Sequence, residues 1–181
     1  MFTTRPLASV IALGTLLGTI AVLSAERPVN ARAALAAGPP WISIETPVNP
    51  YDASTKDAYL LVHAFHHGTP VSVPVSGTAE GLVNGERRTV SLRFAPTSRE
   101  GAFALRKQWG DAGLWTLVIA VHQRDDEIAE ALVEIGNDGE VTRVQVPTRV
   151  GERNPKFPRQ TSAQEIDAAL RLRARTNLAK S

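Results

Sequence analysis

Residues 114–121, LWTLVIAV, constrain the fold of this chain more than any other stretch. Alternate side chains of a β-strand point to opposite faces of its sheet, and here both sets are apolar. One set consists of Leu114, Val118 and Ala120, and the other of Trp115, Leu117, Ile119 and Val121. A strand that is apolar on both faces has to be covered on both faces. The stretch is therefore predicted to be a central strand.

Strand-like patterns recur on both sides of this stretch, at a spacing of roughly 8 to 12 residues. Asn84-Gly85 and Asn137-Asp138-Gly139 are typical of tight hairpin turns, because these residues tolerate positive φ angles. The pattern predicts an all-β protein, an immunoglobulin-like or prealbumin-like antiparallel β-sandwich of about seven or eight strands. The expected strands are residues 41–45, 58–66, 71–83, 88–94, 114–121, 128–135 and 141–146, with a further strand from Gly101.

The N-terminal residues 1–25 are typical of a secretory signal peptide. Arg5 precedes an uncharged apolar run from Leu7 to Leu23, and Ser24-Ala25 supplies small residues for cleavage. The run is also close to the length of a spanning helix, so a retained N-terminal anchor is the alternative. Either alternative predicts export, with the domain periplasmic or extracellular. Residues 26–40 are rich in Ala, Pro and Gly and are expected to be a linker.

The C-terminal part changes character after the predicted sandwich domain, residues 41–147. Residues 148–161 are basic and contain prolines, which indicates a linker, and residues 162–178 have the spacing of an amphipathic helix. Ser162 and Glu165 have the spacing of a capping box at its start. This basic tail could contact lipid headgroups or an acidic partner, and the simpler expectation is a solvated helix that packs weakly on the sandwich.

Composition excludes several classes of function. The chain has no cysteine, so it has no disulfide, thiolate metal site or catalytic thiol. Its 20 basic and 18 acidic residues are too balanced to favour nucleic-acid binding. No nucleophile elbow, zinc-protease motif or phosphate-binding glycine loop is present. We therefore expect a protein that is not an enzyme and that needs no cofactor.

A resemblance to known families rests on residues 101–121. The pattern Gly101-x-Phe103, followed by Gly113-Leu-Trp-Thr-Leu-Val-Ile-Ala-Val, resembles exported bacterial immunoglobulin-like sandwiches. The similar families are the YtkA-like, FixH-like and carboxypeptidase regulatory-like domains. The resemblance implies structural roles, a chain corner at Gly113 and a core position at Trp115, and no catalytic residue. Copper-carrying sandwiches are a more distant comparison, and this chain lacks their histidine near the mature N-terminus.

Four histidines are the candidate metal ligands, namely His63, His66, His67 and His122. Three imidazoles that converge on one point could bind zinc or Cu(II). In a regular strand, however, His63 and His67 would stand about 13 Å apart, and His66 would point to the other face. A bulge before Gly68 could bring His66 and His67 together. Strand-end histidines at the margin of the core are the simpler interpretation, so no metal ligand is assigned.

Two groups of charged residues are weaker candidates. Oxygen ligands from two turns could bind calcium, although no loop has a recognised calcium spacing. These carboxylates are Asp125, Asp126, Glu127, Asp138 and Glu140. Basic residues along a predicted hairpin could bind an anionic polymer, or could simply form a solvated β-face. These residues are Arg87, Arg88, Arg93 and Arg99, interleaved with Glu86 and Glu100.

The function expected from the sequence is therefore that of a non-catalytic exported binding or accessory module with a protein partner. Edge strands of a sandwich can accept a strand from another chain, and residues 71–75 and 41–44 are the predicted edges. A periplasmic metal-binding domain that uses the segment from His63 to His67 is the alternative. No nucleic-acid partner is expected, and membrane association is expected only if the N-terminal segment is retained.

Overall fold

The computed structural model describes residues 40–151 and 156–178. The predicted signal segment and almost all of the predicted linker, residues 26–39, lie outside the described residues. Among the residues that the structure describes, no helix is both long and apolar enough to cross a membrane.

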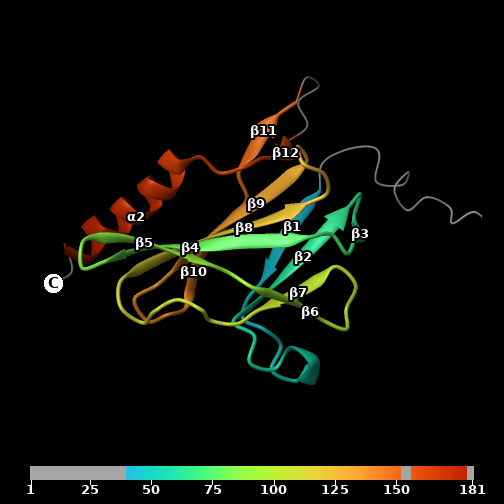
Figure 1. Ribbon diagram of the computed structural model, residues 1–181, viewed down its shortest axis with the longest axis horizontal. Helices are drawn as coiled ribbons and strands as arrows, with labels where there is room; N and C mark the ends of the chain where they lie inside the picture. Colours follow the sequence, from blue (N-terminus) through green and yellow to red (C-terminus); the bar gives the residue numbers. More distant parts are fainter. Residues whose placement is uncertain (1–39, 152–155, 179–181) are drawn as a thin grey trace, which may run out of the picture.

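Two five-stranded antiparallel sheets form the body of the protein (Figure 1). Sheet A has the order β1 (Trp41–Glu45), β2 (Leu60–His66), β7 (Ala102–Leu105) and β6 (Phe94–Pro96), and β3 (Thr69–Pro70) also pairs with β2. Sheet B has the order β10 (Val141–Gln145), β9 (Ile128–Ile135), β8 (Leu114–His122), β4 (Val75–Val83) and β5 (Glu86–Ser91). The other elements are the 3-10 turn η1 (Ala53–Thr55), the two-stranded ribbon β11 (Thr148–Val150) with β12 (Lys156–Pro158), and the helix α2 (Ala163–Leu178). The predicted all-β sandwich with one C-terminal helix is confirmed.

The predicted central strand is β8, which lies between β9 and β4 in the middle of sheet B. Leu117, Ile119 and Val121 are fully buried on its inner face and belong to the core between the two sheets. Sheet A contributes Leu60 and Val62 to the same core, each without exposed surface. The apolar side chains on one face of β8 therefore point toward sheet A, as the sequence predicts.

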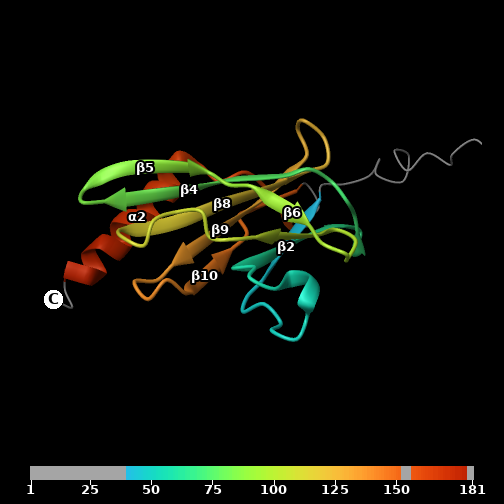
Figure 2. The ribbon, with the colours of Figure 1, turned by 60° about the horizontal axis from the view of Figure 1, so that its bottom comes forward.

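The outer face of sheet B is covered by α2, which contacts β8 and β4. Figure 2 shows α2 against this sheet, on the side away from β2 and β6. Leu170 of the helix is 2% exposed, so it is buried as deeply as a core residue. The expectation of a helix that packs weakly on the sandwich is wrong, because the outer face of β8 is apolar and needs this cover.

The start of α2 has the predicted capping box. Ser162 Oγ accepts a hydrogen bond from Glu165 N at 3.2 Å, and a carboxylate oxygen of Glu165 accepts one from Ser162 N at 2.9 Å. Arg159 adds a two-pronged ion pair, with Nη2 2.7 Å from Glu165 Oε1 and Nη1 2.9 Å from Oε2. The hydrogen bonds from Arg159 and then from Ser162 lower the pKa of Glu165 from its ordinary value of 4.5 to about 2.

This lowered pKa predicts an acid-dependent loss of stability. The folded carboxyl of Glu165 holds its proton less tightly than the unfolded one, so its contribution is complete above pH 4.5 and is lost as the pH falls through about 2. Both side chains of the Arg159 ion pair are about one-third exposed, so screening limits the contribution to roughly 1 kcal/mol. Urea unfolding of Glu165→Gln should show lower stability at neutral pH and a flatter acid limb than wild type. Glu86→Gln, whose side chain is 70% exposed in wild type, is the control, and an unchanged acid limb in Glu165→Gln would contradict the prediction.

Two strand predictions differ from the structure for one reason. The residues predicted as one strand, 88–94, form β5 and then β6, and the chain passes from sheet B to sheet A at the buried Leu92. Residues 71–74 form the link between β3 in sheet A and β4 in sheet B and are not in a strand, and Val75 is the first residue of β4, where it pairs with Val121 of β8. Residues 71–75 are therefore not an edge strand, and that prediction is wrong. The alternation of side chains along the sequence continues through both places where the chain passes from one sheet to the other. The sequence pattern therefore does not reveal these crossings.

Candidate functional site

The predicted edge at the N-terminal end of the domain is present as β1. This strand pairs with β2 in antiparallel register, Ser43 opposite His63, and no other described strand pairs with it. On the far side of β2, Ala64 N donates to Gly101 O at 2.8 Å, so the even-numbered residues of β2 bond toward β7 and the odd-numbered ones toward β1. The backbone N–H and C=O groups of Ser43 therefore hydrogen-bond to β2. The backbone groups of Ile42 and Ile44 point the other way, away from the sheet.

At the other ends of the two five-stranded sheet orders, the strands β5, β6 and β10 carry features that discourage strand addition. The edge strand β5 begins with the charged run from Glu86 to Arg88, and β6 has only three residues and ends at Pro96. The edge strand β10 has a register shift between Val141 and Arg143. Charges, prolines, short length and bulges are the usual protections of an edge. Within the described residues, β1 has none of these between its first and fourth residues, WISI.

The side chains of β1 divide between the core and the surface. Ile42 is 5% exposed and lies in the core, and Ile44 packs against the core from its margin. Trp41 keeps 42% of its surface exposed at the start of the strand. An extended segment beside β1 could therefore bond two sets of free backbone groups and also contact an indole ring, which suits protein recognition.

Two of the candidate histidines lie on outer faces of different sheets. His63 Nε2 lies 2.8 Å from Glu45 Oε2 on sheet A, and His122 Nε2 lies 2.7 Å from Ser76 Oγ on sheet B. Burial raises the pKa of Glu45, but the hydrogen bond from His63 and the charge of nearby Arg99 more than offset this, so its pKa lies below the ordinary value. These histidines therefore serve separate surface contacts.

The other two histidines lie together at the end of β2. The ring centres of His66 and His67 are 4.4 Å apart, and the positive φ of His67, 49°, turns the chain there without a bulge. His66 is 6% exposed, its Nδ1 lies 3.0 Å from Gln123 Oε1, and its Nε2 has no hydrogen-bond partner in the described part of the chain. Zinc needs three or four ligands. No group of three or more His, Cys, Asp or Glu in residues 40–151 and 156–178 is arranged to hold an ion.

The carboxylates considered for calcium lie at opposite ends of β9. Asp125, Asp126 and Glu127 precede this strand, and Asp138 and Glu140 follow it. The strand has eight residues, so its ends are about 26 Å apart. The two turns therefore do not come together into one calcium site, and the simpler interpretation of these carboxylates as charged turn residues stays.

Most of the basic residues considered for an anionic polymer are paired with acids. Arg87 Nη1 lies 2.7 Å from Asp167 of α2, and Arg88 Nη2 lies 2.8 Å from Glu86. Arg99 lies 3.3 Å from Glu45 and 3.6 Å from Asp52. These pairs leave little free positive charge along the hairpin. Arg93 is different, because it lies beside a hollow on sheet A.

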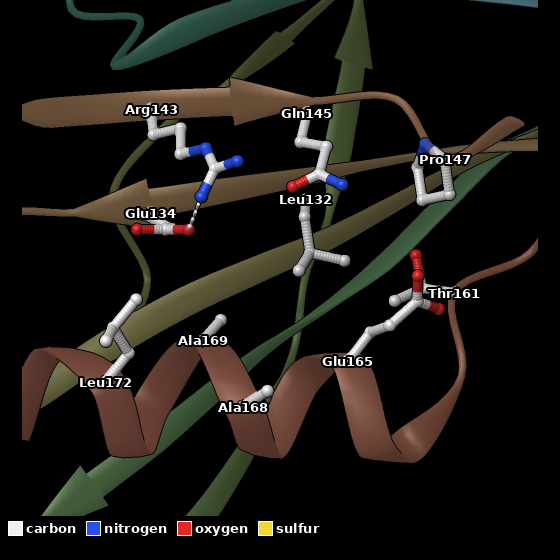
Figure 3. Close-up of a pocket in the computed structure, with 10 residues that line it drawn as sticks. All are labelled: Leu132, Glu134, Arg143, Gln145, Pro147, Thr161, Glu165, Ala168, Ala169 and Leu172. Carbon is white, nitrogen blue, oxygen red and sulfur yellow. Dashed lines mark ion pairs between the residues drawn. The ribbon is translucent and has the colours of Figure 1, made fainter.

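A small groove lies between α2 and the outer face of β9 and β10 (Figure 3). Its volume is about 200 Å³, and Leu172 on its helix side is 62% exposed. The charged side chains that line it already have partners, because Arg143 lies 3.6 Å from Glu134 and Glu165 is held by Arg159. The groove is therefore a seam between helix and sheet with few free polar groups. Its lining consists of Leu132, Glu134, Arg143, Gln145, Pro147, Thr161, Glu165, Ala168, Ala169 and Leu172.

The fold places the chain among the all-β sandwiches. No family model, curated protein or solved structure matches it. The resemblance to YtkA-like, FixH-like and carboxypeptidase regulatory-like domains therefore stays a prediction.

Proposed function

We propose that this protein is a non-catalytic exported binding module that takes up an extended segment of a partner protein along the free side of β1. The observation that carries the proposal is the unpaired side of β1, where the backbone groups of Ile42 and Ile44 point away from β2. Each buried or half-buried backbone group needs a hydrogen-bond partner, and a partner strand supplies one for each group in turn.

The strand β1 is better suited to accept a partner strand than β5, β6 and β10, and this supports the proposed site. The charges of β5, the bulge of β10 and the shortness of β6 disfavour strand addition there. The exposed Trp41 offers a large apolar contact with few rotatable bonds, which suits the centre of a recognition surface. A partner segment with alternating apolar residues fits this edge best.

The test removes one free backbone donor without changing the rest of the strand. Proline is tolerated in an edge strand where its nitrogen faces away from the sheet, so Ile44→Pro should fold and should lose the free N–H. Short phage-displayed peptides selected on the full-length wild-type protein should bind Ile44→Pro at least about tenfold more weakly, as expected for a lost hydrogen bond and a steric block. The affinity for each purified peptide is measured by calorimetry.

Ile44→Ala is the matched control, because it removes the side chain and keeps the N–H. It should bind the peptides within about threefold of wild type, which is less than one hydrogen bond. Ser43→Lys, which adds a charge to the edge, should weaken binding, whereas Ser91→Lys on the edge strand β5 should not. Peptides that bind all four variants equally, or self-association through β1 in place of peptide binding, would overturn the proposal.

A further inference from the structure

A second surface feature lies at the opposite edge of sheet A from β1. A hollow of about 460 Å³ opens on the outer face of β6 and β7, next to η1. Figure 1 shows the short turn η1 in cyan, just beyond these strands. Its volume falls within the range of small-molecule sites, roughly 300 to 1,000 Å³. We call it the β6–β7 hollow. Its lining consists of Ser54, Thr55, Lys56, Arg93, Ala95, Pro96, Thr97, Ala104, Arg106 and Gln108.

The floor and the rim of the β6–β7 hollow differ in character. Ala95 and Ala104 are directly opposite each other in the pairing of β6 with β7, so small side chains form the floor. Lys56, Arg93 and Arg106 stand on the rim from three different segments of the chain. Among the described residues that line the hollow, the charged ones are all basic.

The three rim cations also differ from the other basic residues around them. Lys107 and Arg99 have carboxylate partners, namely Asp111 for the first and Glu45 and Asp52 for the second. Within the described residues, no carboxylate pairs with Lys56, Arg93 or Arg106, whose side chains are all exposed at this surface. A hollow lined by like charges concentrates the potential that attracts ions of the opposite sign.

Gln108 fixes the two arginines relative to each other. Its side-chain oxygen accepts a hydrogen bond from Arg93 N at 3.0 Å. Its Nε2 donates to Arg93 O at 2.9 Å and to Arg106 O at 3.2 Å. One amide therefore ties together the backbone before β6 and the backbone after β7. The two arginine side chains therefore extend from backbone segments that one amide holds together.

The neutral polar groups of the hollow are already engaged. Ser54 Oγ lies 2.6 Å from Asp52 Oδ1, Thr55 Oγ1 donates to Asp52 O at 3.1 Å, and Thr97 Oγ1 donates to Ala102 O at 3.0 Å. Recognition in this hollow therefore depends on the cations. Guanidinium groups bind tetrahedral oxyanions through two parallel hydrogen bonds, which a lysine does not provide.

We propose that the β6–β7 hollow is a binding site for a tetrahedral oxyanion, a phosphate or sulfate group, held by Arg93 and Arg106 with Lys56 as the third cation. The site is independent of the β1 edge, because β1 and β6 are the two opposite ends of the order of sheet A. The alanine floor leaves room for the compact body of a ligand that carries such a group. Binding weakens as salt is added, because the contacts are charged and exposed.

The test uses pyrophosphate and calorimetry with the full-length protein at low and at physiological salt. Arg106→Gln should weaken pyrophosphate binding about tenfold, the effect of one charge-assisted contact. Arg88→Gln removes the same charge from β5 and should change the affinity by less than twofold. In nitrogen-15 spectra, titration should shift the amide signals of Arg93, Arg106 and the side chain of Gln108.

Two further probes distinguish the source of the group. Glycerophosphorylglycerol is a soluble phosphodiester with the chemistry of a lipid headgroup, and sulfate tests the other oxyanion. Binding of either one that is lost in Arg106→Gln supports the site and identifies that chemistry as its ligand. No Arg106-dependent binding of any of the three probes, or equal weakening by Arg88→Gln, would overturn the proposal.

Discussion

Replacement of Gly101 by alanine is expected to destabilise the fold by about 3 kcal/mol or more. Gly101 is buried and has a φ of 68°, and a Cβ at this position would lie 2.8 Å from both Ala64 O and Val71 N. The left-handed conformation costs an alanine about 1 to 2 kcal/mol, and overpacking against backbone adds about 1 to 3 kcal/mol. Backbone atoms cannot rotate away as a side chain can, so the chain crossing at this point has to move.

Two other glycines separate the two causes. Gly139→Ala has only the conformational cost, because its φ is 82° and no atom lies within 4 Å of the added Cβ; about 1 kcal/mol should be lost. Gly110→Ala has neither cost, since its φ is not positive and its surroundings are open; no loss is expected. Urea unfolding measures the loss of stability in all three variants, from the shift of the midpoint at a constant m-value. Equal losses for Gly101→Ala and Gly139→Ala would show that the close approach has no cost.

The features that the sequence predicts correctly are local. Two apolar faces identify β8, and Asn84-Gly85 joins β4 to β5 with φ angles of 52° and 83°. Ser162 and Glu165 bond reciprocally at the start of α2. In each case, neighbouring residues determine the backbone conformation, so a short pattern contains the whole cause.

The features that the sequence does not predict depend on distant pairing. Alternation from Arg88 to Phe94 is the same whether the chain stays in one sheet or crosses at Leu92, because only the partner strands differ. The β6–β7 hollow collects cations from three segments, whereas the sequence pattern groups Arg93 with the arginines of the predicted hairpin. The hydrogen bonds of Gln108 to the backbone of Arg93 and Arg106 cannot be predicted from the residue types in the sequence.

The contact of α2 with the outer face of sheet B is also a feature that the sequence does not predict. It leads to the second substitution with a large expected effect on stability. In the sequence, Arg173 is one of several basic residues of the predicted C-terminal helix, and nothing distinguishes it from the others. In the structure its Nη1 donates to Trp115 O at 2.7 Å and to Thr116 Oγ1 at 3.2 Å, and its Nη2 donates to Ile135 O. Trp115 and Ile135 are opposite each other in the pairing of β8 with β9. One guanidinium therefore satisfies carbonyl groups of two neighbouring strands.

Burial lowers the pKa of Arg173, and the carboxylate of Glu134 partly counteracts this effect. An arginine keeps its charge under such conditions, so its bonds to the two carbonyl oxygens are charge-assisted. Bonds of this kind contribute roughly 1.5 to 3 kcal/mol each, and an unsatisfied buried acceptor costs about 1 to 3 kcal/mol.

Arg173→Ala should therefore lower the free energy of unfolding by about 3 kcal/mol. Arg171→Ala is the matched control, because the Arg171 side chain is 73% exposed and, within the described residues, its one ion pair is with Asp167 at 3.3 Å; a change of less than about 0.5 kcal/mol is expected. Urea unfolding measures both, and hydrogen exchange should show faster opening of α2 in Arg173→Ala alone. If both variants lost the same stability, the helix would be held by the burial of Leu170 and not by the guanidinium. A large loss confined to Arg173→Ala would instead make α2 an integral third layer of the sandwich, anchored through a charge that links the helix to the backbone of its central strands.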